Sequence, residues 1–127
     1  MKPSIFTRII NGDLPSYKVY EDEKTYAFLN INPRQPGSVL VVPREQVDHL
    51  EDLEPEDYSA LMDTVRRLML HICDTLQCER VCVRVEGFEV AHAHVHLIPC
   101  LTEADIEAEP YEAGEDELRD MEERLLF

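Results

Sequence analysis

Residues 54–76 carry the longest regular pattern in the chain, and this pattern limits the possible folds more than any other. Apolar side chains recur there in steps of three and four residues, which is the spacing of one buried stripe along an α-helix. The stripe consists of Tyr58, Leu61, Met62, Val65, Leu68, Met69, Ile72 and Leu76. Pro55 stands in the first turn, and Glu56 and Asp57 lie near the positive end of the helix dipole. We therefore predict one long helix with one buried face.

Shorter patterns on both sides of this helix predict strands and two further helices. Strands are expected at residues 17–20, 25–31, 38–43 and 80–85. The run at 38–43 is continuously apolar and β-branched, which is typical of a central strand. Ser4 as an N-cap and a stop at Asn11-Gly12 enclose a short helix at residues 4–10, and residues 116–127 predict a terminal helix. This order predicts a single antiparallel α+β domain over residues 1–127, with an acidic segment at 101–127.

The charge of the chain narrows the possible partners. There are 27 acidic and 12 basic residues, for a net charge of -15, and 18 of the acids fall in residues 45–57 and 101–127. These segments predict a solvated surface and argue against long nucleic acids, which need a basic patch. No apolar run approaches the roughly 20 residues of a membrane helix. With no signal-peptide pattern and four cysteines without a C-x-x-C pair, we expect a cytoplasmic protein with reduced thiols and no membrane partner.

Three of the five histidines occur in one short segment, at His92, His94 and His96. The residues between them are small or apolar, and this alternation predicts a strand with all three imidazoles on one face. Metal binding through an H-x-H pair is one interpretation. However, the outer two residues would lie roughly 13 Å apart in an extended strand, so a further ligand would be needed. His49 and His71 could supply it, but each is more typical of an ordinary surface or helix residue.

Nucleophilic catalysis is the second interpretation of the histidine row. A neutral imidazole can attack a phosphorus or acyl centre and form a covalent intermediate. His94 is the best placed, because its neighbours could orient it and donate hydrogen bonds to the developing charge. A solvated strand face without function is the third interpretation, although such a face more usually carries Lys, Thr or Glu.

The segment at residues 92–98 resembles the signature of the histidine triad (HIT) family, in which three histidines alternate with apolar residues. Further similarity follows the family pattern in order over about residues 4–100. The matching segments are residues 4–10, 12–15, 21–22, 27–33, 36–37 and 40–44. The resemblance implies an α+β fold with a five-stranded antiparallel sheet, one long helix and short terminal helices. It also implies a homodimer, to which we expect the helix at 54–76 to contribute.

The same resemblance implies a purine-preferring hydrolase acting at the α-phosphate of nucleoside phosphoramidates or nucleotides. His94 would form a nucleotidyl-histidine intermediate, while His92 and His96 would orient it and contact the phosphate. The third histidine stands where the transferase branch of the superfamily carries Gln, which favours hydrolysis. No cofactor is implied.

Family positions also suggest where the nucleoside lies. Ile5, Phe6 and Ile9 would form one apolar wall for the base, and Phe28, Leu29 and Ile31 would form the other. Asn30 stands where the family usually has an aspartate that binds the ribose hydroxyls. Asn can accept one hydrogen bond and donate another, so altered ribose recognition is expected.

Several positions depart from the family pattern. Ser38 replaces a histidine, Cys100 replaces an arginine, and Phe88 and Glu89 replace polar residues that serve the leaving group. Ser4, Thr7 and Gln46 stand where many relatives place zinc ligands, so we predict no bound metal. These departures keep two alternatives to the hydrolase open, which are a nucleotide-binding module with negligible turnover and a metal-binding protein.

Overall fold

A five-stranded antiparallel sheet forms the centre of the fold in a computed structural model that describes residues 2–127. In spatial order the strands are β1 (Lys18–Glu21), β2 (Thr25–Leu29), β3 (Val39–Pro43), β5 (Val95–Cys100) and β4 (Arg80–Arg84). The predicted α+β class is confirmed, and the β-branched run at 38–43 is the central strand. Each of the four strands expected before the histidine segment ends within two residues of its predicted bounds.

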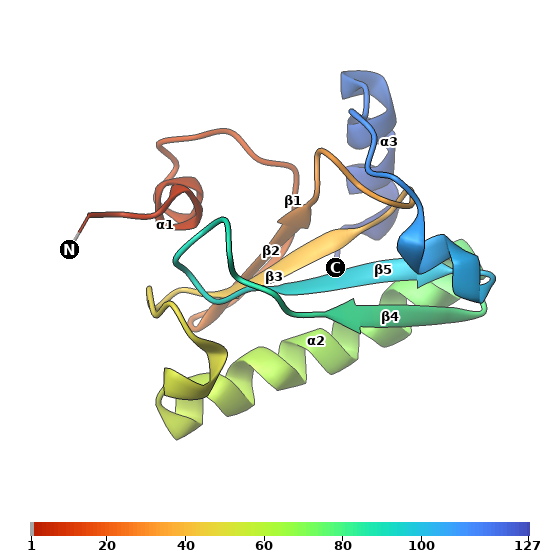
Figure 1. Cartoon of the computed structure of the whole chain (residues 1–127). Coiled ribbons are helices and arrows are strands. Elements are labelled where there is room, and N and C mark those ends of the chain that lie inside the picture. Colours follow the sequence, from red (N-terminus) through yellow and green to blue (C-terminus); the bar gives the residue numbers. More distant parts are fainter. Residues whose placement is uncertain (1) are drawn as a thin grey trace.

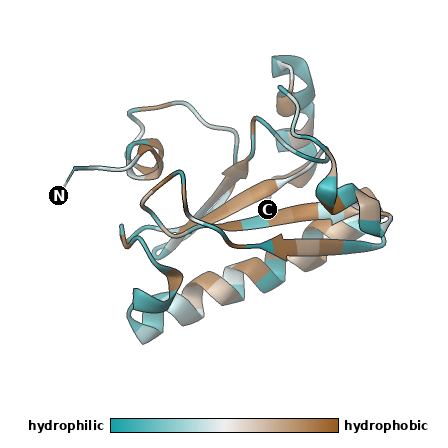
Figure 2. Cartoon of the chain, in the orientation of Figure 1, coloured by the Kyte–Doolittle hydropathy of each residue, from teal (hydrophilic) through white to brown (hydrophobic). Residues whose placement is uncertain are grey.

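The long helix α2 (Pro55–Leu76) covers one face of the sheet (Figure 1). Its buried apolar side chains Leu61, Val65, Leu68 and Ile72 share a core with apolar side chains of β3 and β5. Figure 2 shows apolar residues recurring along the helix. The buried stripe is narrower than the predicted one, because Tyr58 is 42% exposed. The long helix is therefore confirmed, with the first turn outside the core.

Two short helices stand at the ends of the chain. In α1 (Ile5–Ile10), the Ser4 hydroxyl accepts a hydrogen bond from the Thr7 N–H, and Asn11 is the C-cap, so both predicted helix signals are confirmed. The terminal helix α3 (Glu115–Leu125) buries Leu118 and Leu125 in the same core as α2. Short 3₁₀ helices occur at Leu50–Asp52 (η1) and Glu103–Glu107 (η2). No helix described over residues 2–127 is long and apolar enough to cross a bilayer.

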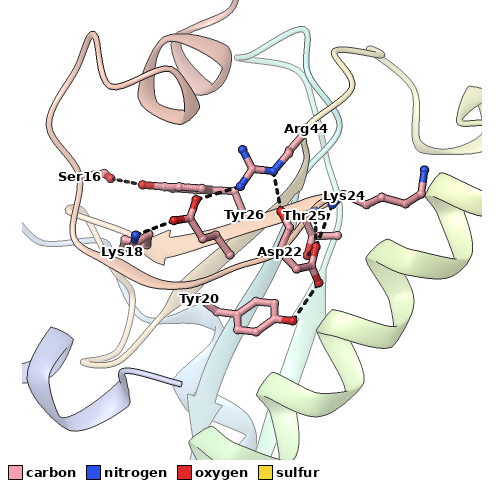
Figure 3. Close-up of polar contacts among 9 residues, drawn as sticks. Ser16, Lys18, Tyr20, Asp22, Lys24, Thr25, Tyr26 and Arg44 are labelled. Atoms are coloured by element: carbon pink, nitrogen blue, oxygen red, sulfur yellow. Dashed lines mark hydrogen bonds and ion pairs between the residues drawn. The ribbon is translucent and has the colours of Figure 1, made fainter.

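The hairpin between β1 and β2 is fixed to the end of β3 by a polar network (Figure 3). Asp22 Oδ1 accepts hydrogen bonds from the backbone N–H groups of Lys24 and Thr25. The Arg44 guanidinium donates to the Asp22 carbonyl at 2.6 Å and to the Glu21 carboxylate at 2.8 Å. Because Arg44 directly follows β3, this network holds the last residue of β3, Pro43, in place.

The acidic segment after β5 lies along the loop between β2 and β3 of its own chain. The backbone N–H of Tyr111 donates to the Pro33 carbonyl, and that of Ala113 donates to the Ile31 carbonyl. The Arg34 side chain donates to the Ala108 carbonyl at 2.8 Å. These bonds place the acidic segment beside the cavity described next.

Candidate active site

A cavity of about 800 Å³ opens on the face of the sheet opposite α2. The residues predicted to contact substrate all line it, and they are Ile5, Phe6, Ile9, Phe28, Leu29, Asn30, Ile31, Ser38, Phe88 and Glu89. His94 and His96 line the same cavity, whereas His92 does not. The fold therefore brings together residues from α1, β2, the following loop and the segment before β5.

The prediction that all three histidines share one strand face is wrong. Strand β5 begins at Val95, so only His96 lies on it, and the pairing of β3 with β5 stops at Val41 and Val95. Continued pairing would set Pro43 against Ala93, but proline has no N–H for the ladder. Ala93 instead donates its N–H to the Val47 carbonyl at 2.7 Å. The chain leaves the sheet there, and His92 lies outside the cavity that the other two histidines line.

His92 is fully buried behind the cavity, and both of its ring nitrogens have partners. Nε2 lies 2.7 Å from the Pro43 carbonyl oxygen and Nδ1 lies 2.7 Å from the Ser4 hydroxyl. Because a carbonyl can only accept, Nε2 carries the proton and Nδ1 accepts from Ser4. Burial lowers the pKa of His92, and His94 lowers it further, although the bond to Pro43 opposes them. His92 is thus a neutral residue in one fixed tautomer.

The side chains at the family's zinc positions form a hydrogen-bonded cluster around His92. The Gln46 side-chain oxygen accepts from the Ser4 N–H at 2.8 Å and from the Thr7 hydroxyl at 2.7 Å. Zinc sites in proteins use thiolate, imidazole and carboxylate ligands, and only His92 belongs to that set here. Within residues 2–127, no three His, Cys, Asp or Glu side chains lie near enough to share a metal ion. The donor set does not fit zinc.

His94 stands between the buried His92 and the cavity. Its Nδ1 lies 2.8 Å from the His92 carbonyl oxygen, so this nitrogen carries the proton and donates it. Nε2, on the opposite side of the ring, then keeps its lone pair. The ring also packs edge-on against Phe6, at a centroid distance of 4.9 Å, and is 7% exposed. This arrangement orients one unprotonated ring nitrogen for attack.

His96 lies beside His94, with ring centroids 5.0 Å apart. In the strand register it faces Leu40 on β3 and Arg84 on β4. Burial, followed by the neighbouring His94, lowers the pKa of His96 to about 4. His96 is therefore neutral at pH 7, where it can donate one hydrogen bond and accept another but does not act as a cationic acid.

The apolar end of the cavity has one buried and one exposed part. The Phe6 and Phe28 rings lie 5.6 Å apart and both are 5% exposed, while Ile5 and Ile31 are about half exposed at the rim. Leu29 borders the cavity, but it belongs to the core shared with α2. Its assignment to the wall for the base is therefore weaker than that of Phe28, because successive strand residues point to opposite faces.

The polar positions that depart from the family pattern are mostly engaged with the backbone or exposed. The Asn30 side-chain oxygen accepts from the Asn32 N–H at 2.9 Å, and the Ser38 hydroxyl donates to the Gln35 carbonyl at 2.7 Å. Phe88 is 97% exposed, and Glu89 is also exposed. The segment 88–89 thus lines the rim of the cavity without a buried donor.

Sequence reasoning missed two basic residues of the site, Arg34 and Arg84, which line the cavity beside His96. The alternation at residues 80–85 predicted a strand with Arg84 on one face. That alternation did not reveal which strand would lie beside it, and only the pairing of Arg84 with His96 places this arginine in the cavity. Arg34 lies in an irregular loop for which periodicity gives no direction.

The sequence of the chain is similar to a known protein family and to individual proteins. Residues 11–102 match the family model described as HIT domain. The chain is 36% identical over 100 residues to an uncharacterized HIT-like protein of Methanocaldococcus jannaschii, covering 75% of this chain and 77% of that protein. It is also 36% identical to an adenosine 5'-monophosphoramidase of Candida albicans, covering 79% of this chain and 72% of that protein.

The fold is likewise similar to solved structures. The crystal structure of a HIT-like protein from Bartonella henselae superposes with a TM-score of 0.86 at 25% sequence identity. The similarity covers 96% of this chain and 93% of that one. The likeness thus includes the terminal helices as well as the sheet and α2.

Proposed function

Because the chain belongs to the HIT family, we propose that it hydrolyses nucleoside phosphoramidates or nucleotides at the α-phosphate, with His94 as the nucleophile. The hydrogen bond from His94 Nδ1 to the His92 carbonyl supports this most directly, since it leaves Nε2 unprotonated at the edge of the cavity. The similarity to an adenosine 5'-monophosphoramidase is consistent with this class of substrate.

The proposed reaction has two displacements at phosphorus. His94 Nε2 attacks the α-phosphorus, the N–P bond forms, and the bond from phosphorus to the leaving group breaks with its electron pair on that group. An amine leaving group also takes up a proton from solvent, whereas a phosphate leaves as an anion. The His92 carbonyl accepts the Nδ1–H and stabilises the positive charge that develops on the His94 ring. Water then attacks the phosphorus and breaks the N–P bond, which releases a nucleoside monophosphate and one proton and restores His94.

The remaining residues would bind the nucleoside and the phosphate. The base would lie against Phe6 and Phe28, with Ile5, Ile9 and Ile31 around it, and a purine would cover more of this apolar surface than a pyrimidine. The Asn30 oxygen already accepts a backbone hydrogen bond, so its amide nitrogen would serve the ribose. His96, neutral and beside His94, would donate a hydrogen bond to a phosphate oxygen.

A second candidate function is a nucleotide-binding module with negligible turnover. The exposure of Phe88 and Glu89 favours it, because neither residue provides a donor inside the cavity for the leaving group. Tight nucleotide binding by calorimetry, without turnover across a broad panel of nucleotides and phosphoramidates, would support this alternative over hydrolysis.

We also propose that the chain forms a homodimer through α2 and β4. Strand β4 lies at the edge of the sheet, and its Val83 is 43% exposed on the side that faces α2. On α2, Leu70 is 65% exposed, and it borders a shallow surface shared with Val81 of β4. An isologous contact would cover these apolar side chains in both copies. Light scattering at micromolar concentration should give a dimer, and Leu70→Glu should give a monomer.

An activity assay tests the proposed reaction. The purified chain is offered adenosine and guanosine 5'-phosphoramidates and related dinucleotides, and nucleoside monophosphate release is followed. His94→Ala should lower the rate by at least about a thousandfold, because it removes the nucleophile. His49→Ala is the matched control, since His49 is exposed and does not line the cavity, and it should retain wild-type rates. Equal rates in wild type and His94→Ala would contradict the covalent mechanism.

A further inference from the structure

Two arginines gather at the end of the cavity beyond His96, in a chain whose net charge is -15. Arg84 on β4 lies directly opposite His96 on β5, so the two side chains share one face of the sheet. Arg34 reaches the same cavity from the loop after β2, and its Nη1 donates to the Ala108 carbonyl. This end of the cavity therefore holds two guanidinium groups, with the carboxylate of Glu86 beside them.

Arg84 is incompletely partnered in a way that points to an anionic ligand. Its Nη1 is the one buried side-chain nitrogen or oxygen without a hydrogen-bond partner in the described part of the chain. The nearest carboxylates lie 3.8 Å from its Nε (Glu86) and 3.7 Å from its Nη2 (Glu107), which is beyond hydrogen-bond distance. A buried, unsatisfied guanidinium N–H destabilises a fold, and a bound ion is one explanation for its presence.

The groups around His94 supply no proton for a leaving group. His96 is neutral at pH 7, Phe88 has no donor, and Glu89 is exposed. An amine needs a proton in order to leave, whereas a phosphate can leave as an anion once its charge is balanced. Guanidinium groups balance and bind phosphate through paired N–H groups, and they keep their charge throughout.

We propose that Arg34 and Arg84 form an anion subsite that binds a second phosphoryl group, so that the preferred substrates are nucleotides whose α-phosphate is linked to a further phosphate. This inference rests on the proposed function and narrows its substrate class. In the first displacement His94 Nε2 bonds to the α-phosphorus, and the bond from that phosphorus to the bridging oxygen breaks. The electron pair stays on the bridging oxygen of the departing phosphate, whose charge the two guanidinium groups balance.

A binding experiment tests the subsite without any turnover. Inorganic tripolyphosphate is titrated into the full chain by calorimetry, in buffer that contains a chelator. Arg84→Gln and Arg34→Gln should each weaken its binding by about tenfold, the loss expected for a charge-assisted hydrogen bond. Arg66→Gln, on an exposed position of α2, changes the net charge equally and should leave binding within about twofold. Equal weakening in all three variants would overturn the subsite, as would unchanged binding in Arg84→Gln and Arg34→Gln.

A kinetic ratio separates the subsite from the proposed function. We compare kcat/KM for adenosine 5'-triphosphate with that for adenosine 5'-phosphoramidate, and expect Arg84→Gln to lower this ratio at least about tenfold. A ratio unchanged in Arg84→Gln, with turnover still dependent on His94, would overturn the subsite and leave the proposed hydrolase intact. If neither substrate is turned over, the proposed function fails and the tripolyphosphate titration decides the subsite alone.

Thermal unfolding tests whether Arg84→Gln weakens tripolyphosphate binding only because it destabilises the fold. Without ligand, Arg84→Gln should unfold at the wild-type temperature or above it, because the substitution removes an unsatisfied buried group. Tripolyphosphate should raise the unfolding temperature of the wild type more than that of Arg84→Gln. If Arg84→Gln does not fold, Arg34→Gln provides the same test from the loop, where the arginine bonds only a backbone carbonyl in its own chain.

Discussion

The two ends of the cavity are built differently. At the nucleophile end, His92 is fully buried, both of its ring nitrogens have partners, and its carbonyl fixes the proton of His94. At the leaving-group end, Phe88 is 97% exposed and Arg84 has a buried nitrogen without a partner. A satisfied buried network specifies one geometry, whereas a bound ion is one explanation for a buried group that lacks a partner. The difference suggests that the chemistry is fixed at one end and substrate choice is set at the other.

At the nucleophile end, a large effect on stability is expected from removing the buried histidine. His92→Ala would leave the Pro43 carbonyl and the Ser4 hydroxyl without their ring partners and would create a cavity. We expect a loss of about 3 kcal/mol in the free energy of unfolding, measured by urea denaturation. We also expect the reaction rate to fall by about a hundredfold, because the His92 carbonyl would no longer be held in place. His49→Ala is the control. Equal effects of the two substitutions would show that the buried network around His92 does not fix the geometry of the nucleophile end.

The second expected effect is that acidification lowers the free energy of unfolding through the buried histidines at the nucleophile end. In the folded chain the pKa of His96 is about 4 and that of His92 is also lowered, while an unfolded histidine titrates near 6.5. Between pH 6.5 and 4 the unfolded chain binds more protons than the folded chain, so the free energy of unfolding decreases as the pH falls. We expect a loss of about 2 kcal/mol, which is less than the full shifts would give because part of the His96 ring is exposed.

Carboxylates also titrate in this range, so the pH effect needs a variant that isolates the histidine. His96→Gln keeps a neutral polar side chain at this position and should show a smaller loss of stability than the wild type between pH 7 and 5. Identical pH profiles for the two proteins would show that the burial of His96 contributes nothing to the acid sensitivity.

A smaller effect is expected at the edge of the buried network. Ser4→Ala removes both the N-cap of α1 and the donor to His92 Nδ1. We expect a loss of about 1 to 2 kcal/mol in the free energy of unfolding. Ser4→Thr keeps the hydroxyl and should recover most of this loss, which distinguishes the hydrogen bond from simple packing. A variant Ser4→Ala as stable as wild type would show that the hydrogen bond from Ser4 to His92 contributes nothing to stability.

These results also show what the sequence could predict. The periodic segments predicted every strand before the histidine segment and the long helix within two residues, because each pattern reflects burial on one face. The prediction of a strand through His92 was wrong. The point where the pairing of β3 with β5 stops depends on Pro43, which lies in a different strand about 50 residues earlier. Arg84 was missed as a site residue for a related reason, because the register that sets it opposite His96 is a long-range property.

The smallest effect is expected at the open end of the cavity. Phe88 is 97% exposed, so Phe88→Ala should change the free energy of unfolding by no more than about 0.5 kcal/mol. Phe28→Ala is the contrasting substitution, because Phe28 is 5% exposed and packs against Phe6, and it should cost about 3 kcal/mol. A loss above 1 kcal/mol for Phe88→Ala would mean that the rim is part of the packed structure.

The central claim is that His94 forms a covalent bond to the substrate phosphorus. Its most direct test is to quench the reaction rapidly under basic conditions during turnover and to measure the mass of the intact chain. We predict a nucleoside monophosphate adduct on the wild type and on His49→Ala, mapped to His94 by peptide analysis, and no adduct on His94→Ala. Turnover that His94→Ala leaves unchanged, or an adduct mapped to another residue, would contradict the account.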